Sequence, residues 1–309
     1  MLFRLIVAKK FKRLIVIPDG PLAQLPFETL VVEPADKPRY LLDVDVPIEY
    51  ATSATILLNL AGRASSRDRA GQQVLTVGDP RYGQPLARTR GDALAELAPQ
   101  SRYASLGGSL TALPYSKWET DWVAGVFREK GTEVVQLRES QATEANVRAK
   151  AEGRKLLHLA CHGLVDHAYG NFFGALALTP GPSADDPDDD GFLTLAEVYA
   201  LDLRGTELAV LSACDTNYGP QQQGEGVWAL SRGFHVAGAR RVVASNWLVD
   251  DEAAASLISY FCGGLASAEK ESEPTDYARA LHNAQRWIRQ QDKWSSPYYW
   301  GTFVLMGPN

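Results

Sequence analysis

The sequence contains few cysteines and no long apolar run. Its three cysteines, Cys161, Cys214 and Cys262, are an odd and sparse set that does not suit a disulfide framework. No apolar run reaches the roughly 18–20 residues that a helix needs to cross a bilayer. The first 20 residues alternate basic and apolar pieces without a small-residue cleavage site, so they do not resemble a signal peptide. We therefore expect a cytoplasmic protein without a membrane partner.

An excess of positive charge is also missing. The chain has 31 Lys and Arg residues against 37 Asp and Glu residues, which gives a net charge of −6. Proteins that bind nucleic acid draw much of their affinity from clustered basic side chains that face phosphates. We therefore expect no direct nucleic-acid partner.

Apolar residues, by contrast, are plentiful enough for a large core. They make up 45% of the 309 residues. Short β-branched runs predict strands at Leu14–Ile17, Val74–Val77, Val134–Leu137, Leu156–Cys161, Leu208–Ala213 and Val242–Ser245. Helical patterns predict helices over 116–130, from Thr143, and over 226–237, 250–265 and 276–290, before a terminal strand at Thr302–Met306. This alternation predicts an α/β fold with a largely parallel sheet and helices on both faces.

The polar, small-residue segment Arg63–Gly71 is the candidate linker in this fold. It predicts a smaller N-terminal α/β half, residues 1–70, and a main unit, residues 71–309. Within the main unit, Ser116 and Glu119 have the spacing of a capping box, which predicts that a helix opens at Ser116.

Two buried strands end at residues that can carry chemistry. One strand runs directly into His162 and Gly163, and another ends at Cys214, 52 residues later. Reactive side chains collect at the carboxyl ends of parallel strands, where loops open onto a crevice. A thiol needs a base to become a thiolate, and imidazole titrates in the right range. Gly163 lets the backbone approach the substrate closely, and its N–H can help hold an oxyanion. The pattern predicts a nucleophile at Cys214 and a base at His162.

The chain resembles the CHAT family of caspase-like peptidase domains, which are often attached to tetratricopeptide repeats. The resemblance rests on motifs in sequence order: IPDGPL (17–22), LPFE (25–28), HLACHG (158–163), LSACDT (211–216), GEG (224–226), GARRVVASNW (238–247) and WGTFV (300–304). It implies a caspase–haemoglobinase fold related to separase, with the motif His at His162 and the motif Cys at Cys214. The 52-residue spacing is also typical of caspases. The chain begins close to the domain edge, so we expect a regulatory repeat region or a separate partner protein.

The other cysteines and histidines have simpler interpretations. Cys161 points to the opposite strand face from His162 and is expected in the core, as is Cys262 in an amphipathic helix. Cys214 itself could be a small buried hydrophobe, but its position at a strand end favours the nucleophile. His158 and His162 lie about 13 Å apart on a strand, which is too far for a shared metal ion. His235 and His282 lie in helical patterns and suggest no chemistry.

The substrate pocket is predicted from four residues near the Cys214 strand end: Asp215, Trp247, Asp250 and Asp251. The segment Trp247–Asp251 resembles the separase stretch that contributes an acid to the pocket for a basic P1 side chain. A carboxylate there would bind Arg or Lys through a charge-assisted hydrogen bond. The alternative is structural, because Asp250 or Asp251 can also cap the following helix.

Together these observations predict a cysteine endopeptidase with a His162–Cys214 dyad, an oxyanion site at the N–H groups of Gly163 and Cys214, and no required cofactor or metal. Two alternatives stay open. One is a non-catalytic effector or assembly module that keeps the fold for binding. The other is a thiol hydrolase that acts on something other than protein.

One further motif fits a calcium loop. Asp186, Asp188, Asp190 and Gly191, followed by Glu197, have the spacing of an EF-hand loop. Pro187 and the lack of a preceding helical pattern argue against it. An exposed acidic loop explains the same residues.

We expect calcium to be dispensable for any activity. Addition of a chelator should leave the cleavage rate unchanged, because the acidic loop needs no ion to stay solvated. Cleavage should be assayed with and without chelator, followed by a calcium titration. Activity that is lost on chelation and restored by micromolar to millimolar calcium, the range that such loops cover, would contradict this.

Overall fold

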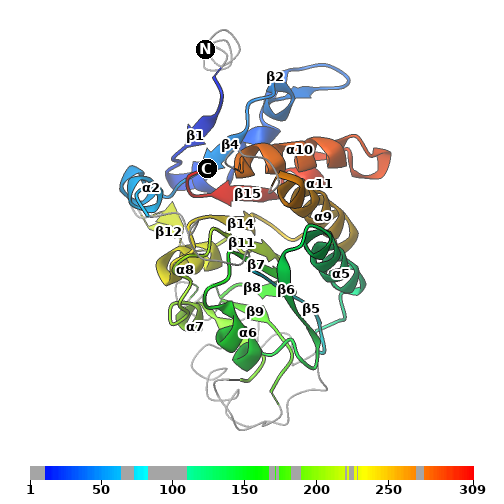
Figure 1. Cartoon of the computed structure of the whole chain (residues 1–309). Helices are drawn as coiled ribbons and strands as arrows, with labels where there is room; N and C mark the ends of the chain where they lie inside the picture. Colours follow the sequence, from blue (N-terminus) through cyan, green and yellow to red (C-terminus); the bar gives the residue numbers. More distant parts are fainter. Residues whose placement is uncertain are drawn as a thin grey trace.

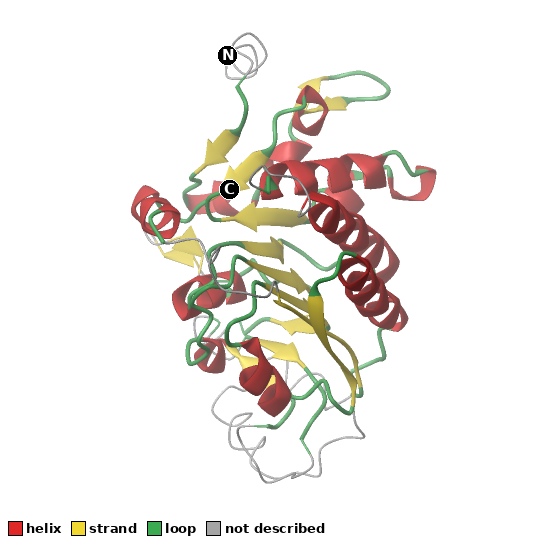
Figure 2. Cartoon of the chain, viewed as in Figure 1, coloured by secondary structure: helices red, strands yellow, loops and turns green. Residues whose placement is uncertain are grey.

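A computed structural model describes residues 11–63, 73–82, 110–166, 171, 174–181, 189–219, 221–222, 226–227, 229–268 and 275–309 (Figure 1). Figure 2 colours the helices, strands and loops of this part of the chain differently. Among these residues, no helix is both long enough and apolar enough to cross a membrane.

An eight-stranded sheet forms the centre of the fold, in the order β1-β4-β15-β14-β11-β7-β5-β6. Its strands are β1 (Leu14–Val16), β4 (Ile48–Tyr50), β5 (Gln73–Pro80), β6 (Glu133–Glu139), β7 (Leu156–Ala160), β11 (Leu208–Ser212), β14 (Val242–Ser245) and β15 (Phe303–Met306). The neighbours from β14 to β6 pair in parallel, whereas β15 runs antiparallel to β14. The sheet confirms the predicted α/β class and its largely parallel character.

Helices cover both faces of this sheet, as predicted (Figure 1). One face packs against α5 (Pro114–Glu129), α9 (Asp251–Ala268) and α10 (Tyr277–Arg289). The other face packs against α6 (Glu144–Ala151), α7 (Leu195–Val198) and α8 (Leu230–Ala237). The central strands are largely apolar because alternate residues enter the two cores: Leu157 and Leu159 enter one, and Leu156 enters the other.

Smaller elements surround the sheet. They are η1 (Gly20–Gln24), η2 (Phe27–Thr29), β2 (Val31–Glu33), β3 (Arg39–Tyr40), η3 (Leu41–Val44), α2 (Ala54–Ala61), β8 (His162–Leu164), β9 (Ala175–Ala177), β10 (Phe192–Thr194), β12 (Gln221–Gln222), β13 (Gly226–Val227), η5 (Asp292–Trp294) and α11 (Pro297–Trp300). Strands β8, β9 and β10 form a separate three-stranded antiparallel sheet.

Two local predictions are wrong. The capping box does not form, because α5 already begins at Pro114 and places Ser116 and Glu119 inside the helix, on buried positions. The helix predicted over 226–237 begins only at Leu230, and Gly226–Val227 is a short strand instead. By contrast, the predicted cap at Thr143 is confirmed, since its hydroxyl accepts the Asn146 N–H at the start of α6.

The predicted division of the chain stays a prediction. Most of the candidate linker Arg63–Gly71 lies outside the described residues. Strands β1 and β4 come from the predicted N-terminal half, and β4 pairs in parallel with β15 from the C-terminal end. Both halves therefore contribute strands to one sheet.

Helix α5 lies unusually close to β5. A Cβ atom at Gly78 would lie 1.9 Å from the Thr120 hydroxyl and 2.9 Å from the Ser116 carbonyl oxygen. The Ser116 hydroxyl also accepts the Asp79 N–H at 3.1 Å. Only glycine at position 78 permits this approach of helix and strand.

We predict that Gly78→Ala destabilises the fold by about 1–3 kcal/mol, because the new methyl group overpacks a filled contact with α5. The free energy of unfolding should be measured by urea denaturation. Gly125→Ala is the matched control: Gly125 lies on α5, and its Cβ would meet no atom within 4 Å among the described residues. That control should be stabilised by up to about 1 kcal/mol through helix propensity. Equal stability of Gly78→Ala and the wild type would contradict the close contact.

Candidate active site

The pairing of β7 with β11 brings the two predicted catalytic positions together. The strands are parallel neighbours, with Ala160 opposite Ser212. His162 and Cys214 each follow two residues after this last pair, so they leave the sheet at the same level. The Cys161 N–H extends the contact by donating to the Ser212 carbonyl at 3.3 Å. His162 and Cys214 therefore follow adjacent parallel strands.

Gly163 allows the chain segments that follow β7 and β11 to approach each other closely. A Cβ atom at this position would lie 2.0 Å from the carbonyl oxygen and 3.1 Å from the nitrogen of Cys214. Any side chain there would collide with the Cys214 backbone, so a glycine is needed for β8 to pass against it. His162 is thereby held directly beside Cys214.

The His162 side chain is held by two residues that sequence reasoning missed, Thr111 and Tyr82. Its Nε2 lies 2.8 Å from the Thr111 carbonyl oxygen. Because a carbonyl only accepts, Nε2 carries a proton and Nδ1 is the basic nitrogen of the neutral ring. The His162 backbone N–H donates to the Tyr82 hydroxyl at 3.1 Å, and the two rings lie 5.0 Å apart. Tyr82 follows the end of β5, so its strand-end position was a usable signal. The Thr111 carbonyl gave no sequence signal, because every residue has a backbone carbonyl.

The Cys214 thiol is partly exposed, unlike the other two cysteines. The Val249 N–H approaches its Sγ at 3.5 Å. Burial raises the pKa of Cys161 and of Cys262, both of which lie in the core, as predicted. A high pKa keeps a thiol protonated and unreactive. Cys214 is therefore the cysteine placed for chemistry.

The loop after Cys214 is tied to the end of the neighbouring strand β14. Asp215 adopts a left-handed conformation with φ 54°, and its N–H approaches the Trp247 carbonyl at 3.4 Å. The Ser245 N–H donates to the Thr216 hydroxyl at 2.9 Å. These contacts place Asp215 and Trp247 next to Cys214, at the same edge of the sheet.

Trp247 forms an aromatic wall with Tyr298, which sequence reasoning also missed. The rings stack at 6.5 Å and 19°, and the indole N–H donates to the Tyr298 carbonyl at 3.0 Å. Burial raises the pKa of the Tyr298 hydroxyl, and the nearby Cys214 and Asp250 raise it further. Tyr298 lies 84 positions after Cys214 in a short helix, α11, so no spacing or motif linked it to the thiol.

Asp250 and Asp251 both contact backbone N–H groups. Asp250 Oδ1 accepts the Ala253 N–H at 2.9 Å, which caps α9. Asp251 Oδ2 accepts the Tyr115 N–H at 3.1 Å, which joins α9 to the start of α5. Burial raises the pKa of Asp251, against the lowering effect of the Tyr115 N–H. The two acids therefore serve structural roles, in the segment directly after Val249, whose N–H approaches the Cys214 thiol.

Three other histidines lie in the described part of the chain, His158, His235 and His282, and they show no metal arrangement there. His158 is buried between Glu119 and Thr76. His235 is buried in α8, and burial lowers its pKa to about 4; burial also lowers that of His282 to about 4. In the part of the chain that the structure describes, no group of three or more His, Cys, Asp or Glu side chains is placed to hold a metal ion.

The proposed calcium loop is only partly described. Asp186 and Asp188 lie outside the described residues. Glu197 forms a capping box with Thr194 at the start of α7, and Asp190 accepts the Phe192 N–H at 2.9 Å. Asp190 is nevertheless partly buried: burial, together with the nearby Glu197 carboxylate, raises its pKa to about 6. The neighbouring Asp189 is buried and accepts the Ala145 N–H at 2.9 Å. The described part of this loop is therefore not the exposed acidic loop expected from the sequence.

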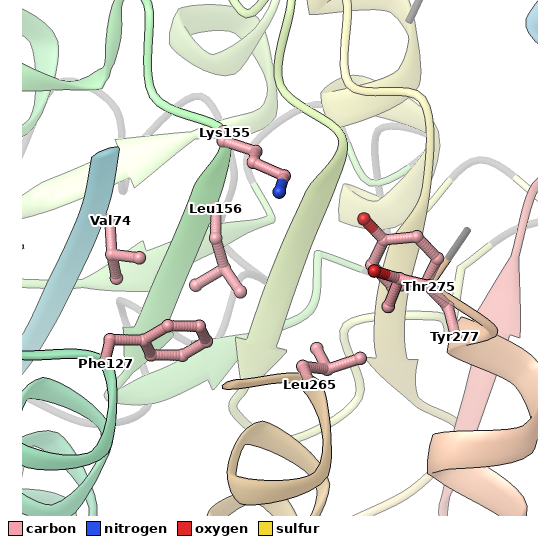
Figure 3. Close-up of a pocket in the computed structure, with 7 residues that line it drawn as sticks. All are labelled: Val74, Phe127, Lys155, Leu156, Leu265, Thr275 and Tyr277. Atoms are coloured by element: carbon pink, nitrogen blue, oxygen red, sulfur yellow. The ribbon is translucent and has the colours of Figure 1, made fainter. Parts of the chain in front are cut away.

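A small apolar pocket lies at the opposite edge of the sheet from Cys214 (Figure 3). It is lined by Val74, Phe127, Lys155, Leu156, Leu265, Thr275 and Tyr277. Val74 and Leu156 are at the amino ends of β5 and β7. It is therefore separate from the strand ends that carry His162 and Cys214.

Solved structures similar to this chain are cysteine peptidases with a caspase-like fold. Gingipain R, an Arg-specific cysteine proteinase, matches with a TM-score of 0.51 and 12% identity, over 85% of this chain and 54% of its own. The Saccharomyces cerevisiae separase in a separase–securin complex matches with a TM-score of 0.51 and 11% identity, over 96% of this chain and 15% of its own. The chain thus spans about half of the first structure and a small part of the second. At such identities the likeness shows the fold alone.

No curated protein matches the sequence. The sequence profile of the CHAT domain matches residues 2–308, almost the entire chain. The chain therefore belongs to the CHAT domain family.

Proposed function

We propose that this protein is a cysteine endopeptidase that cleaves protein substrates with a His162–Cys214 dyad. The observation that supports the proposal is the close approach of Gly163, the residue after His162, to the Cys214 backbone. The Thr111 carbonyl directs the basic Nδ1 away from itself, and Cys214 is the partly exposed cysteine. Membership of a family with caspase-like peptidase folds supports the same reaction class.

The proposed reaction has two steps. His162 Nδ1 takes the proton of the Cys214 thiol, and the thiolate attacks the scissile carbonyl carbon. The N–H groups of Gly163 and Cys214 hold the resulting oxyanion. His162 then protonates the leaving amine, which leaves a thioester on Cys214. A water molecule, deprotonated by His162, hydrolyses the thioester and restores the thiol. The Thr111 carbonyl stabilises the imidazolium formed in each step by accepting its Nε2–H.

We further propose that a regulatory region or a partner protein controls this activity. The separase structure is a complex with securin. Most of that separase chain lies outside the match to this protein, since only 15% of it is covered. A comparable controlling region or partner would act at the carboxyl ends of β7 and β11, which lead to His162 and Cys214.

Cys214→Ala and His162→Ala should each abolish cleavage, because residues that act as a unit lose nearly all activity singly. Cys161→Ala is the matched control and should leave activity largely intact, since that thiol faces the core. Proteome-wide cleavage profiling of the three variants and the wild type measures this. Retained activity in Cys214→Ala together with loss in Cys161→Ala would identify the other thiol as the nucleophile. Full biological function of Cys214→Ala would favour a binding module, and a wild type that cleaves no peptide would favour a different thiol hydrolase.

We also propose that Asp250 or Asp251 binds a basic P1 side chain beside the Trp247–Tyr298 wall. Wild-type protein should therefore prefer Arg or Lys before the scissile bond, through a charge-assisted hydrogen bond. Asp250→Asn and Asp251→Asn should weaken this preference in a peptide library. Asn caps a helix about as well as Asp, so Asp250→Asn removes the charge and keeps the cap of α9.

Asp276→Asn is the matched control for this experiment. Asp276 caps α10 in the same way, with Oδ1 accepting the Arg279 N–H at 2.8 Å. Its substitution should leave P1 preference unchanged. A wild type that prefers apolar P1 residues would end the proposal for the two acids and leave the dyad in place.

A further inference from the structure

Beneath the strand ends that carry His162 and Cys214, Glu119 forms a buried polar cluster. The residue is buried, with a relative exposure of only 2%. Oε1 lies 2.7 Å from His158 Nε2 on β7, and Oε2 accepts the Ser212 hydroxyl on β11 at 3.0 Å. The other ring nitrogen of His158 lies 2.7 Å from the Thr76 hydroxyl on β5. One side chain of α5 therefore joins three adjacent strands.

The elements joined in this way carry the parts of the candidate active site. β7 leads to His162 four residues after His158, and β11 leads to Cys214 two residues after Ser212. The segment before α5 supplies the Thr111 carbonyl that bonds to His162. The start of the same helix is also held by Asp251 at the Tyr115 N–H. Glu119 is thus the point at which helix and strands are connected beneath the dyad.

Burial of a carboxylate in this position is costly unless its oxygens are paired. Both Glu119 oxygens have partners, so the cost is offset. Apolar contacts between a helix and a sheet tolerate small sliding movements, whereas hydrogen bonds of 2.7–3.0 Å from one carboxylate to two strands are directional. A polar cluster in an otherwise apolar core is consistent with a need for one fixed alignment.

We infer that Glu119, through His158 and Ser212, is a positioning residue that holds α5 against β7 and β11 and so keeps the Thr111 carbonyl, His162 and Cys214 aligned. The inference rests on the proposed dyad. It assigns Glu119 no contact with substrate. Because the role depends on hydrogen-bond geometry, the shape of the Glu119 side chain and its ability to form hydrogen bonds matter more than its charge.

Cys214 alkylation by iodoacetamide tests this without a protein substrate. Its rate across pH, followed by mass spectrometry of the Cys214 peptide, reports thiolate formation. Glu119→Leu should reduce the rate at neutral pH on the order of 10-fold to 100-fold, as expected for a displaced catalytic group. The rate profile should also shift toward that of an ordinary thiol, whose pKa is about 8.5. Other titratable groups around Glu119 are His158, Cys161, Cys262 and Asp251, and all are retained.

Two further variants separate positioning from folding. Glu119→Gln can accept from Ser212 and donate to His158, so it should keep most of the wild-type rate. Ser212→Ala removes one bond only and should lower the rate in the same direction by less, with the fold checked by thermal unfolding. Ser259→Ala is the matched control, because Ser259 is similarly buried on the neighbouring helix α9 and its hydroxyl has no hydrogen-bond partner among the described residues.

Wild-type alkylation in folded Glu119→Leu or Ser212→Ala would overturn the inference, as would a Glu119→Gln variant that loses as much as Glu119→Leu. If Glu119→Leu does not fold, Ser212→Ala and Glu119→Gln decide the question. Failure of the proposed dyad gives a different result. Cys214 in His162→Ala would then be alkylated at the wild-type rate, and both proposals would be wrong. Absence of peptide cleavage with His162-dependent alkylation would instead leave the positioning role standing.

Discussion

Because β7 and β11 pair in parallel with Ala160 opposite Ser212, the chain segments that follow them emerge side by side. The contact between Gly163 and the Cys214 backbone depends on this register, as does the place of His162. A one-residue slip would turn every side chain of one strand to the other face of the sheet. Such a slip would remove His158 or Ser212 from the face on which both contact Glu119, so this polar contact favours the observed register.

Helix α5 supplies the second constraint on the candidate active site. It lies against β5 at Gly78, bonds to β7 and β11 through Glu119, and meets α9 at the contact of Asp251 with the Tyr115 N–H. The residues just before it provide the carbonyl that orients His162. The position of this helix against the sheet therefore also places the Thr111 carbonyl, which accepts the His162 Nε2–H.

Elements with strong periodicity were predictable from the sequence, because a buried parallel strand or an amphipathic helix leaves a local pattern. The strand at 242–245 matches its prediction, and the other central strands differ by a few residues at their ends. The capping box failed for a physical reason. Residues 116 and 119 are three positions apart, so inside a helix they share one face. Here that face lies against the sheet, and Glu119 bonds to β7 and β11 instead of the helix backbone.

The sequence by itself determined which residues are chemically able to act and which strands they follow. Buried runs ending at His162 and Cys214 indicated two strand ends. The close contact of Gly163 with the Cys214 backbone was not predicted. Only the tertiary structure decided what surrounds them: the Thr111 carbonyl, the Tyr82 hydroxyl, the Tyr298 ring and the two acids bonded to backbone N–H groups. These contacts join segments far apart in the chain, and most use backbone groups that every residue possesses. No local sequence pattern predicts these contacts, because only the folded sheet brings those segments to the same ends of its strands.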